Sequence, residues 1–353
     1  MNKVYVVIVN YKKYSDTIEC LESVLKSNYP DFQVFVIDNS PNDSSLSYFL
    51  NWVSTNSYSG ITTNFNNLVF PLEDKPISHV FINESECSNS TVLFDERIVF
   101  VRSANRGFAA ANNIVLKYIL SRRIDSSFIW LLNNDTVVEK NTLSNLAAVY
   151  EQNPGSKFVC GGKLRFYHNP DVIQAIVGNY NKWLGKHIHI GNGEIDAGQY
   201  DHYIPGKMDY IVGASMFFPK LFVEEAGLMC EDYFLYFEEL DWMQMGIKKG
   251  FKAMVVPNAI IYHKEGSSII GDDNGKKDFT TAEYYSITNR VKFIKKWYPW
   301  NLITVMPGVI WALAKRIIQG KLSLVKQVSG TIIKILLTDN FKHSCKIVND
   351  KQL

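Results

Sequence analysis

Four short apolar runs, each followed directly by polar residues, constrain the fold of this chain most strongly. They occupy residues 4–9, 32–37, 98–101 and 128–132. Each run is continuous rather than alternating, which is typical of parallel strands buried on both faces. Amphipathic helical patterns follow two of these runs, as expected for strands joined by helical crossovers. The sequence therefore predicts an α/β domain around a mostly parallel, Rossmann-like sheet.

The polar residues after these runs should meet, because ligands bind outside the carboxyl ends of the strands in an open parallel sheet. The chain has no G-x-G-x-x-G after the first run and no P-loop, so the two common phosphate-binding fingerprints are absent. We expect a nucleotide-type crevice at this edge. Its candidate residues are Asn10, Tyr11, Asp38, Asn39, Asn105, Arg106, Gly107, Asn133, Asn134 and Asp135.

Asp135 has the right chemistry for a metal ligand, because it follows a buried strand at the edge where a diphosphate would bind. A hard cation such as Mn²⁺ or Mg²⁺ prefers oxygen ligands of this kind. An equally good explanation of this residue alone is that it caps the following helix.

Three carboxylates crowd together in the second half of the chain, in the segment YFEELDW. Glu238, Glu239 and Asp241 lie there among aromatic residues. Burial and like-charge neighbours raise the pKa of a carboxyl group, as a general base near neutral pH requires. Acidic residues are also favoured at helix N-termini. That preference explains one of these carboxylates easily, but it explains three together less well. His187 and His189 are interpreted as surface residues.

The C-terminal part of the chain is basic. Residues 1–282 contain 25 basic and 32 acidic side chains, whereas residues 283–353 contain 12 and 3. Residues 297–314 carry no charge, and five Lys or Arg residues follow among Ile, Leu and Val. This pattern predicts amphipathic helices on an anionic membrane surface. The alternative is a pair of ordinary packing helices; no motif supports nucleic-acid binding.

We accordingly expect a catalytic domain over residues 1–280, with an inserted surface segment at 54–97 that is rich in Asn, Ser and Thr, and C-terminal helices over 281–353. Five scattered cysteines without a C-x-x-C pair fit a reducing compartment. The N-terminus shows no signal peptide. These observations predict a cytoplasmic protein, peripheral on the inner face of the cell membrane.

Seven segments in register resemble family 2 glycosyltransferases, in particular the bacterial rhamnosyltransferase-like branch. The resemblance extends from residue 4 to about residue 298. Its segments are VVIVNYKKYSDTIECLESVL, FVIDNS, NRGFAAANN, LLNNDT, VGASMFF, FLYFEELDW and IIYHKEGSS. It implies a GT-A fold, with a donor-binding half to about residue 160 and an acceptor half over 161–280.

The resemblance also implies residue roles. Asn10, Tyr11 and Asp38 would hold the base and ribose, and Arg106 would lie near the phosphates. Asn133 and Asp135 occupy the ends of the family's D-x-D motif, with Asn in place of the first carboxylate. His263, in the His-x-x-Gly-x-Ser segment, would complete the metal site, although a lone His at a strand end is ordinarily structural.

On the acceptor side, the resemblance places the base at Glu239, where the family usually has Asp. Glu238 and Asp241 remain candidates for catalytic or structural contacts. Acceptor-binding residues would be Gly213, Ala214, Ser215 and Trp242.

The reaction implied is an inverting, metal-dependent transfer from a dTDP-, UDP- or GDP-sugar, with rhamnose as the first candidate, to a lipid-linked saccharide in cell-surface polysaccharide synthesis. Two alternatives remain at this point: a nucleotidyltransferase on a similar fold, and a non-catalytic sugar-nucleotide-binding module. The sequence does not specify an oligomeric state.

Overall fold

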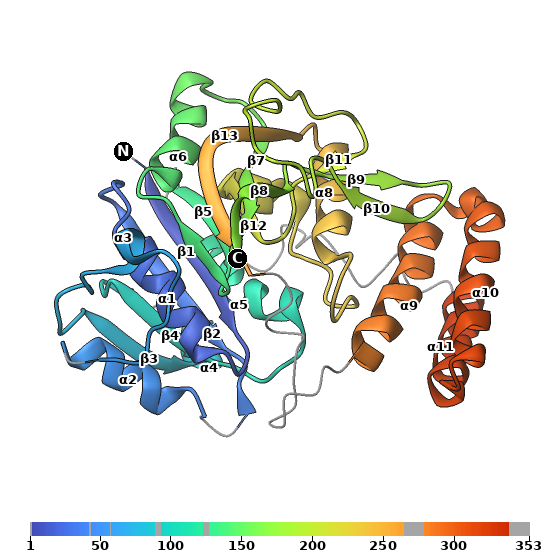
Figure 1. The fold of residues 1–353 in the computed structure, drawn as a ribbon, viewed down its shortest axis with the longest axis horizontal. Helices are drawn as coiled ribbons and strands as arrows, with labels where there is room; N and C mark the ends of the chain where they lie inside the picture. The colour runs from blue at the N-terminus through green and yellow to red at the C-terminus, as the bar shows by residue number, and fades with distance from the viewer. Residues whose placement is uncertain are drawn as a thin grey trace.

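The predicted parallel strands form the central part of a large sheet (Figure 1). β1 (Lys3–Asn10) lies in the middle and pairs in parallel with β2 (Phe32–Asp38) on one side and β5 (Ser127–Asn133) on the other. β4 (Ile98–Arg102) and β3 (His79–Asn83) extend the parallel sheet beyond β2. All four predicted strands are therefore confirmed, and their carboxyl ends share one edge.

The computed structural model describes residues 2–41, 44–56, 58–88, 93–122, 127–264 and 279–338. The predicted loop at 266–276 and the end of the chain beyond 338 lie outside these ranges. The remaining helices are α1 (Tyr14–Leu25), α2 (Leu46–Ser54), α3 (Asn66–Val69), α4 (Glu84–Cys87), α5 (Phe108–Leu120), α6 (Thr142–Gln152), α7 (Lys220–Ala226), α8 (Glu238–Lys248), α9 (Phe279–Trp297), α10 (Leu302–Ile318) and α11 (Leu322–Leu337).

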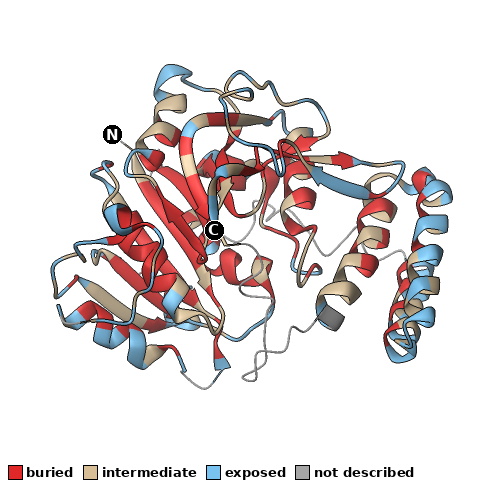
Figure 2. Ribbon diagram, viewed as in Figure 1, coloured by how far each residue is buried: buried red, intermediate tan, exposed pale blue. Residues whose placement is uncertain are grey.

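Both faces of the parallel strands are buried, which explains the continuous apolar runs. Along β1, Val4, Val6 and Ile8 pack in one core cluster with side chains of α1, whereas Tyr5 and Val7 pack in a second cluster with side chains of α5. Figure 2 shows these strands buried along most of their length. Because successive side chains of a strand point to opposite faces, no alternation of polar and apolar residues remains.

Beyond β5 the sheet becomes mixed. β12 (Ser215–Pro219) runs antiparallel between β5 and β7 (Phe158–Phe166), and β13 (Lys252–His263) runs parallel to β7. β6 (Thr136–Val138) pairs with the end of β13 and β8 (Asn169–Ala175) with β7. β13 is one strand with an irregularity between Val256 and Ile260. A small sheet contains β10 (Lys186–His189), β9 (Gly178–Asn181) and β11 (Asp209–Tyr210).

The segment 54–97, expected as a surface insertion, also contributes to the main sheet. Its strand β3 pairs with β4 in parallel register from His79↔Ile98 to Asn83↔Arg102, and α3 and α4 flank it in sequence. β3 is an edge strand with mostly half-buried residues. Its continuous apolar run, VFI, has only three residues and is shorter than the runs that identified the central strands.

Candidate active site

A buried hydrogen-bond network joins the ends of β1 and β2. Asn10 Nδ2 donates to Asp38 Oδ1 at 2.8 Å and lies 3.1 Å from Ser45 Oγ, and the side chain of Asn10 is fully buried. Ser40 Oγ accepts the backbone N–H of Lys12 at 2.8 Å, and the backbone N–H of Asn39 donates to the Asn10 carbonyl. The predicted convergence of Asn10, Asp38 and Asn39 is therefore observed.

Thr17, in the first turns of α1, connects this network to the end of β5. Its hydroxyl donates to Asn10 Oδ1 at 2.8 Å and accepts from Asn134 Nδ2 at 2.9 Å. Asn134 and Asp135 form the turn between β5 and β6. The carboxylate of Asp38 is therefore coupled through the side chains of Asn10 and Thr17 to Asn134, the residue that precedes Asp135.

Asp135 and His263 face each other because β6 and β13 pair in antiparallel register. His263 is opposite Thr136, and the backbone N–H of Lys264 donates to the Asp135 carbonyl at 3.0 Å. His263 Nε2 lies 3.1 Å from Asp135 Oδ1 and 3.3 Å from Asn133 Nδ2. The structure thus brings together Asn133, Asp135 and His263, three residues predicted as metal ligands from positions 130 residues apart.

The atoms of this cluster fit a divalent cation. His263 Nδ1 lies 2.7 Å from Gln174 Oε1, so Nδ1 carries a proton and donates it to that amide oxygen. In the neutral imidazole, the Nε2 lone pair then faces the carboxylate of Asp135, an arrangement that a bound cation would stabilise. Two ligands about 2.1 Å from a Mg²⁺ ion at a right angle would lie about 3 Å apart.

The protein alone supplies few ligands to this site. Within the described residues, no group of three or more His, Cys, Asp or Glu side chains is placed to hold a metal ion. A cation at Asp135 and His263 would thus need the Asn133 amide oxygen, after rotation of that amide, together with water or donor phosphate oxygens. Such shared ligation is usual for Mg²⁺, which is held by one or two carboxylates and substrate phosphates.

The carboxylates of YFEELDW follow a turn with unusual backbone geometry. Tyr236 and Phe237 both have positive φ, of 67° and 74°. Among the described residues, Lys12 is the only other non-glycine residue with positive φ, and it lies beside Asn10. Buried Asn289 of α9 stabilises the turn, because its Nδ2 donates to the carbonyls of Leu235 and Tyr236 at 2.8 and 3.1 Å. Left-handed geometry of this kind at non-glycine residues clusters at functional sites.

The two glutamates that follow this turn differ in their protonation. Burial raises the pKa of Glu239, whereas burial and then the charge of Glu239 raise the pKa of Glu238 well above its usual range. Glu238 is 5% exposed, and its Oε2 has no hydrogen-bond partner among the described residues. Because repulsion opposes the ionisation of both groups together, we expect Glu239 to lose its proton before Glu238.

The segment 213–215 lies between Glu239 and the metal-binding cluster. A Cβ atom added to Gly213 would lie 3.4 Å from Glu239 Cγ, and the Ala214 carbonyl accepts the backbone N–H of Asn133 at 3.0 Å. Ser215 Oγ is buried and accepts a hydrogen bond from Trp130 Nε1 at 2.9 Å. Gly213 and Ala214 therefore connect the two chemical centres, while Ser215 holds the strand in the core.

Trp242 does not lie where an acceptor would bind. Its side chain is completely buried against Phe218 and Phe222, and its Nε1 donates to the Gly227 carbonyl at 2.8 Å. The prediction of an acceptor contact for Trp242 is therefore wrong. Trp242 is buried because it packs with Leu240 and Met243 of α8 in one hydrophobic core cluster.

Asp241 also has a structural environment. Its carboxylate is fully buried and accepts hydrogen bonds from Lys296 Nζ at 2.7 Å, Trp297 Nε1 at 2.6 Å and the Tyr233 hydroxyl at 3.3 Å. Burial raises the pKa of Asp241, although Lys296 and Trp297 favour its charged form. These contacts join α8 to α9. The structure therefore assigns Asp241 to the packing of these helices and not to the chemistry.

Replacing Asp241 by alanine is expected to destabilise the protein, because half-buried Lys296 and Trp297 would lose their buried acceptor. Removing one partner of a buried ion pair lowers the free energy of unfolding by about 3–5 kcal/mol. Denaturant unfolding followed by circular dichroism measures this change. Asp171→Ala is the control, since Asp171 is exposed. Equal stability of the two variants would contradict the structural role.

The segment 105–107 contacts the acceptor half of the chain. The guanidinium of Arg106 pairs with Glu84, and its side chain is half exposed. Asn105 Oδ1 accepts the backbone N–H of Gly107, whose φ is +95°. A Cβ atom at Gly107 would lie 2.5 Å from the Phe234 carbonyl oxygen, so only glycine permits this approach. These interactions do not test the prediction that residues 105–107 contact the donor, and it stays a prediction.

The site also contains residues that sequence reasoning did not identify. Thr17, Gln174 and Asn289 hold the functional side chains in place, but isolated polar residues of these types give no recognisable pattern. β10 carries His187 and His189 close to the site. The His187 ring lies 6.1 Å from that of Phe237, and burial followed by the charge of His263 lowers the pKa of His189.

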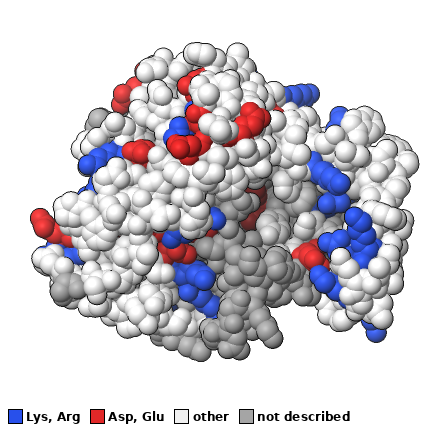
Figure 3. Space-filling view, viewed as in Figure 1, with Lys and Arg blue, Asp and Glu red and all other residues white. Residues whose placement is uncertain are grey.

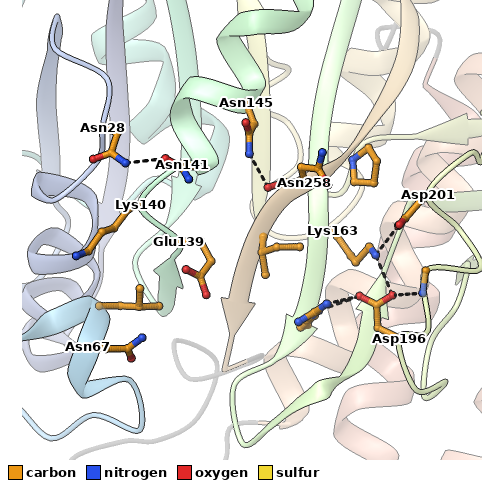
Figure 4. Close-up of a pocket in the computed structure, with 15 residues that line it drawn as sticks. Asn28, Asn67, Glu139, Lys140, Asn141, Asn145, Lys163, Asp196, Asp201 and Asn258 are labelled. Atoms are coloured by element: carbon orange, nitrogen blue, oxygen red, sulfur yellow. Dashed lines mark hydrogen bonds and ion pairs between the residues drawn. The ribbon is translucent and has the colours of Figure 1, made fainter.

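A separate pocket of about 830 Å³ lies near β6, β7 and β13 (Figure 4). Lys163 Nζ, which lines it, pairs with Asp196 at 2.8 Å and Asp201 at 2.7 Å. Asn145 Nδ2 donates to the Asn258 carbonyl at 2.7 Å across another part of the wall. None of the predicted site residues lines this pocket, so it is distinct from the centre around Asp135 and Glu239.

A comparison with protein families identifies one match. The model for glycosyl transferase family 2 matches residues 5–63, which include β1, α1 and β2. No curated protein matches the chain in sequence.

Solved structures resemble the chain at low sequence identity. GalNAc-T7 with UDP, GalNAc and Mn²⁺ has a TM-score of 0.52 at 13% identity, over 84% of this chain and 48% of that one. A mannosyltransferase from Pyrobaculum calidifontis with GDP-Man and Mn²⁺ has a TM-score of 0.47 at 13% identity, over 98% and 83%. TarS 1-349 from S. aureus has a TM-score of 0.43 at 12% identity, over 85% and 74%.

The predicted resemblance to family 2 glycosyltransferases is confirmed over residues 5–63 by the family model, which also supports the prediction that the chain is a glycosyltransferase. The likeness to the GalNAc-T7 structure supports the predicted GT-A fold, and the rhamnosyltransferase-like branch stays a prediction. At these identities the solved structures bear on the fold alone.

Proposed function

We propose that this GT-A glycosyltransferase is an inverting enzyme that transfers a sugar from a nucleotide-diphosphate donor to a lipid-linked saccharide. One observation carries the proposal. The Asn10–Asp38 network, the Asp135–His263 pair and Glu239 are linked through Thr17, Asn134 and the segment 213–215 at one edge of the sheet.

The donor would bind across the ends of β1, β2 and β5. The Asp38 carboxylate, which already accepts from Asn10, has further capacity to accept hydrogen bonds from a base or ribose. Tyr11 and Asn39 flank it in sequence. Asn133, Asp135 and His263 would hold a divalent cation, in accord with the Mn²⁺ named for two neighbours. When bound, that cation stabilises the negative charge of the leaving diphosphate.

The acceptor hydroxyl would be deprotonated by Glu239. The side chain of Glu239 lies beside Gly213. Because Gly213 has no side chain, the space next to the carboxylate stays open. The proton moves from the acceptor oxygen to Glu239 as that oxygen attacks the anomeric carbon from the face opposite the diphosphate, so the configuration inverts. The turn at Tyr236 and Phe237, which Asn289 holds by hydrogen bonds, sets where α8 begins and so where Glu239 stands.

The C-terminal helices support a location at the inner face of the cell membrane. Residues Pro299–Ile318 form an apolar helical segment whose length and composition would allow it to cross a bilayer. In the most apolar 18-residue stretch of this segment, 17% is buried in the protein. Lys and Arg are the main charges on the right-hand face in Figure 3, over α9, α10 and α11. A basic, apolar surface suits an enzyme whose acceptor is attached to a lipid.

Incubation of the purified protein with dTDP-rhamnose, UDP- and GDP-sugars tests this function. We expect one donor to be hydrolysed slowly when Mn²⁺ or Mg²⁺ is present and not after chelation, with release of the nucleoside diphosphate. Release of pyrophosphate from a nucleoside triphosphate and a sugar phosphate would indicate a nucleotidyltransferase instead. Binding of a donor without turnover, even with lipid-linked acceptors, would indicate a non-catalytic module.

A further inference from the structure

The tip of the β9–β10 hairpin holds two apolar side chains in solvent. Trp183 is 59% exposed and Leu184 is 57% exposed. Asn181 Oδ1 accepts the backbone N–H groups of both residues, at 3.0 and 3.1 Å, and its carbonyl accepts that of Gly185 at 2.8 Å. The tip is thus a hydrogen-bonded turn that presents Trp183 and Leu184 outward.

This tip lies against the beginning of α10 (Figure 1). A Cβ atom at Gly185, whose φ is +62°, would lie 2.9 Å from Val305 Cγ1 and 3.1 Å from Arg290 Cγ. The ammonium group of Lys182 lies 5.6 Å from the centre of the Tyr298 ring. Two segments more than 100 residues apart in sequence therefore meet at one end of the C-terminal helices.

The outer face of α10 and its preceding turn is also apolar and exposed. Val305 and Val309 on the opposite face are buried against the protein. A helix with one face packed on protein and the other in solvent fits a position along a surface better than a bilayer span. The exposed side chains of this outer face are Trp300 (86%), Ile303 (76%), Ile310 (61%), Trp311 (64%), Ile317 (51%) and Ile318 (84%).

The charges around these side chains have one sign. Residues 182–190 and 299–338 contain no Asp or Glu, and they contain seven Lys or Arg residues. Lys182 and Lys186 flank the hairpin tip, and Lys315 and Lys326 are exposed on α10 and α11. Exposed Trp beside Lys is typical of segments that bind the headgroup region of anionic bilayers.

We propose that the hairpin tip and the outer face of α10 form one docking surface for an anionic bilayer. This inference rests on the proposed membrane location and adds a second membrane contact from within the catalytic domain. His187, two residues after Gly185 of the tip, lies beside Phe237. The hairpin would therefore lead from the bilayer surface to the carboxylates that receive a lipid-linked acceptor.

The double variant Trp183→Ala/Leu184→Ala tests the contribution of the tip. Sedimentation with vesicles of phosphatidylglycerol and phosphatidylcholine measures the affinity of the full chain, and pure phosphatidylcholine vesicles measure the need for anionic lipid. Ile195→Ala/Ile204→Ala is the matched control, because these side chains are 71% and 87% exposed outside the proposed surface. Trp300→Ala/Ile303→Ala tests the α10 part, and circular dichroism checks that each variant is folded.

We expect roughly tenfold weaker binding to anionic vesicles for each surface variant, since both lose apolar area that the headgroup region would cover. The control should bind like the wild type, and neutral vesicles should bind weakly. Wild-type affinity of the tip variant would overturn the proposal. A lipid-free dimer that the tip substitutions dissociate would overturn it too, because the surface would then be a protein interface. Donor hydrolysis by the wild-type protein is measured separately, without vesicles. If the protein binds vesicles as expected but does not hydrolyse any donor, the proposed function is contradicted and the docking surface is not.

Discussion

Asp135→Ala is expected to abolish metal-dependent turnover while the protein stays folded. Asp135 is the carboxylate that faces His263 Nε2 at 3.1 Å, and the Asn133–Asn134 segment before it contributes only amides. A metal ion contributes several kcal/mol of transition-state charge stabilisation, and each 1.36 kcal/mol corresponds to a factor of ten in rate. We therefore expect donor hydrolysis to fall by roughly three orders of magnitude, measured by nucleotide release with Mn²⁺.

The binding of Mn²⁺ itself gives a second measurement that does not depend on activity. Titration of wild type and variant with Mn²⁺, followed by electron paramagnetic resonance, should show loss of the bound ion in Asp135→Ala. Asp95→Ala, at an exposed position before β4, is the control. Full activity of Asp135→Ala, or unchanged wild-type activity after exhaustive chelation, would show that this residue does not hold a catalytic cation.

The donor side of the site could be predicted because parallel strands impose its geometry. Once residues 4–9, 32–37 and 128–132 are interpreted as adjacent strands, their polar ends must share an edge, and the structure joins Asn10 to Asp38 there. The pairing of His263 with Asp135 came from the resemblance to a family. The sequence alone gives no signal that β13 ends beside β6, since that register depends on pairs such as His263 and Thr136, which lie far apart in sequence.

The acceptor side was predicted less well for a physical reason. YFEELDW places an acidic or aromatic residue at nearly every position, so its composition cannot reveal which side chains face the core. The start of α8 decides this, and it turns Asp241 and Trp242 inward. The partners of Asp241 are Lys296 and Trp297, 55 and 56 residues away, and they become visible only when α9 packs on α8.

The edge strand β3 shows the same limit in the fold. Its residues 79–83 pair with β4 but are largely half-buried, and their run of three apolar residues is too short to stand out from the Asn- and Ser-rich segment around it. Continuous apolar runs identify strands covered on both faces, and an edge strand lacks that cover. The sequence pattern therefore predicts the centre of this sheet better than its margin.

Glu239→Gln is expected to stop transfer while donor binding is retained. Glutamine keeps the size of the side chain beside Gly213 but cannot accept the acceptor's proton, and loss of a general base lowers the rate by roughly two to four orders of magnitude. Sugar transfer to a lipid-linked acceptor measures the loss, and nucleotide titration should show near wild-type affinity. Glu238→Gln is the matched control, because neutral Glu238 resembles glutamine and its replacement should have a milder effect.

The pH dependence of transfer separates the two glutamates further. A base acts only when it is deprotonated, so the wild-type rate should fall as the pH drops through the pKa of Glu239. Because burial raises this pKa, the fall should begin at a higher pH than for an exposed glutamate, and the residual rate of Glu239→Gln should lack this step. If Glu239→Gln transfers sugar normally and Glu238→Gln is a folded, donor-binding but inactive protein, the base is Glu238. The order of ionisation inferred from their burial would then be reversed, with Glu239 as the neutral member of the pair.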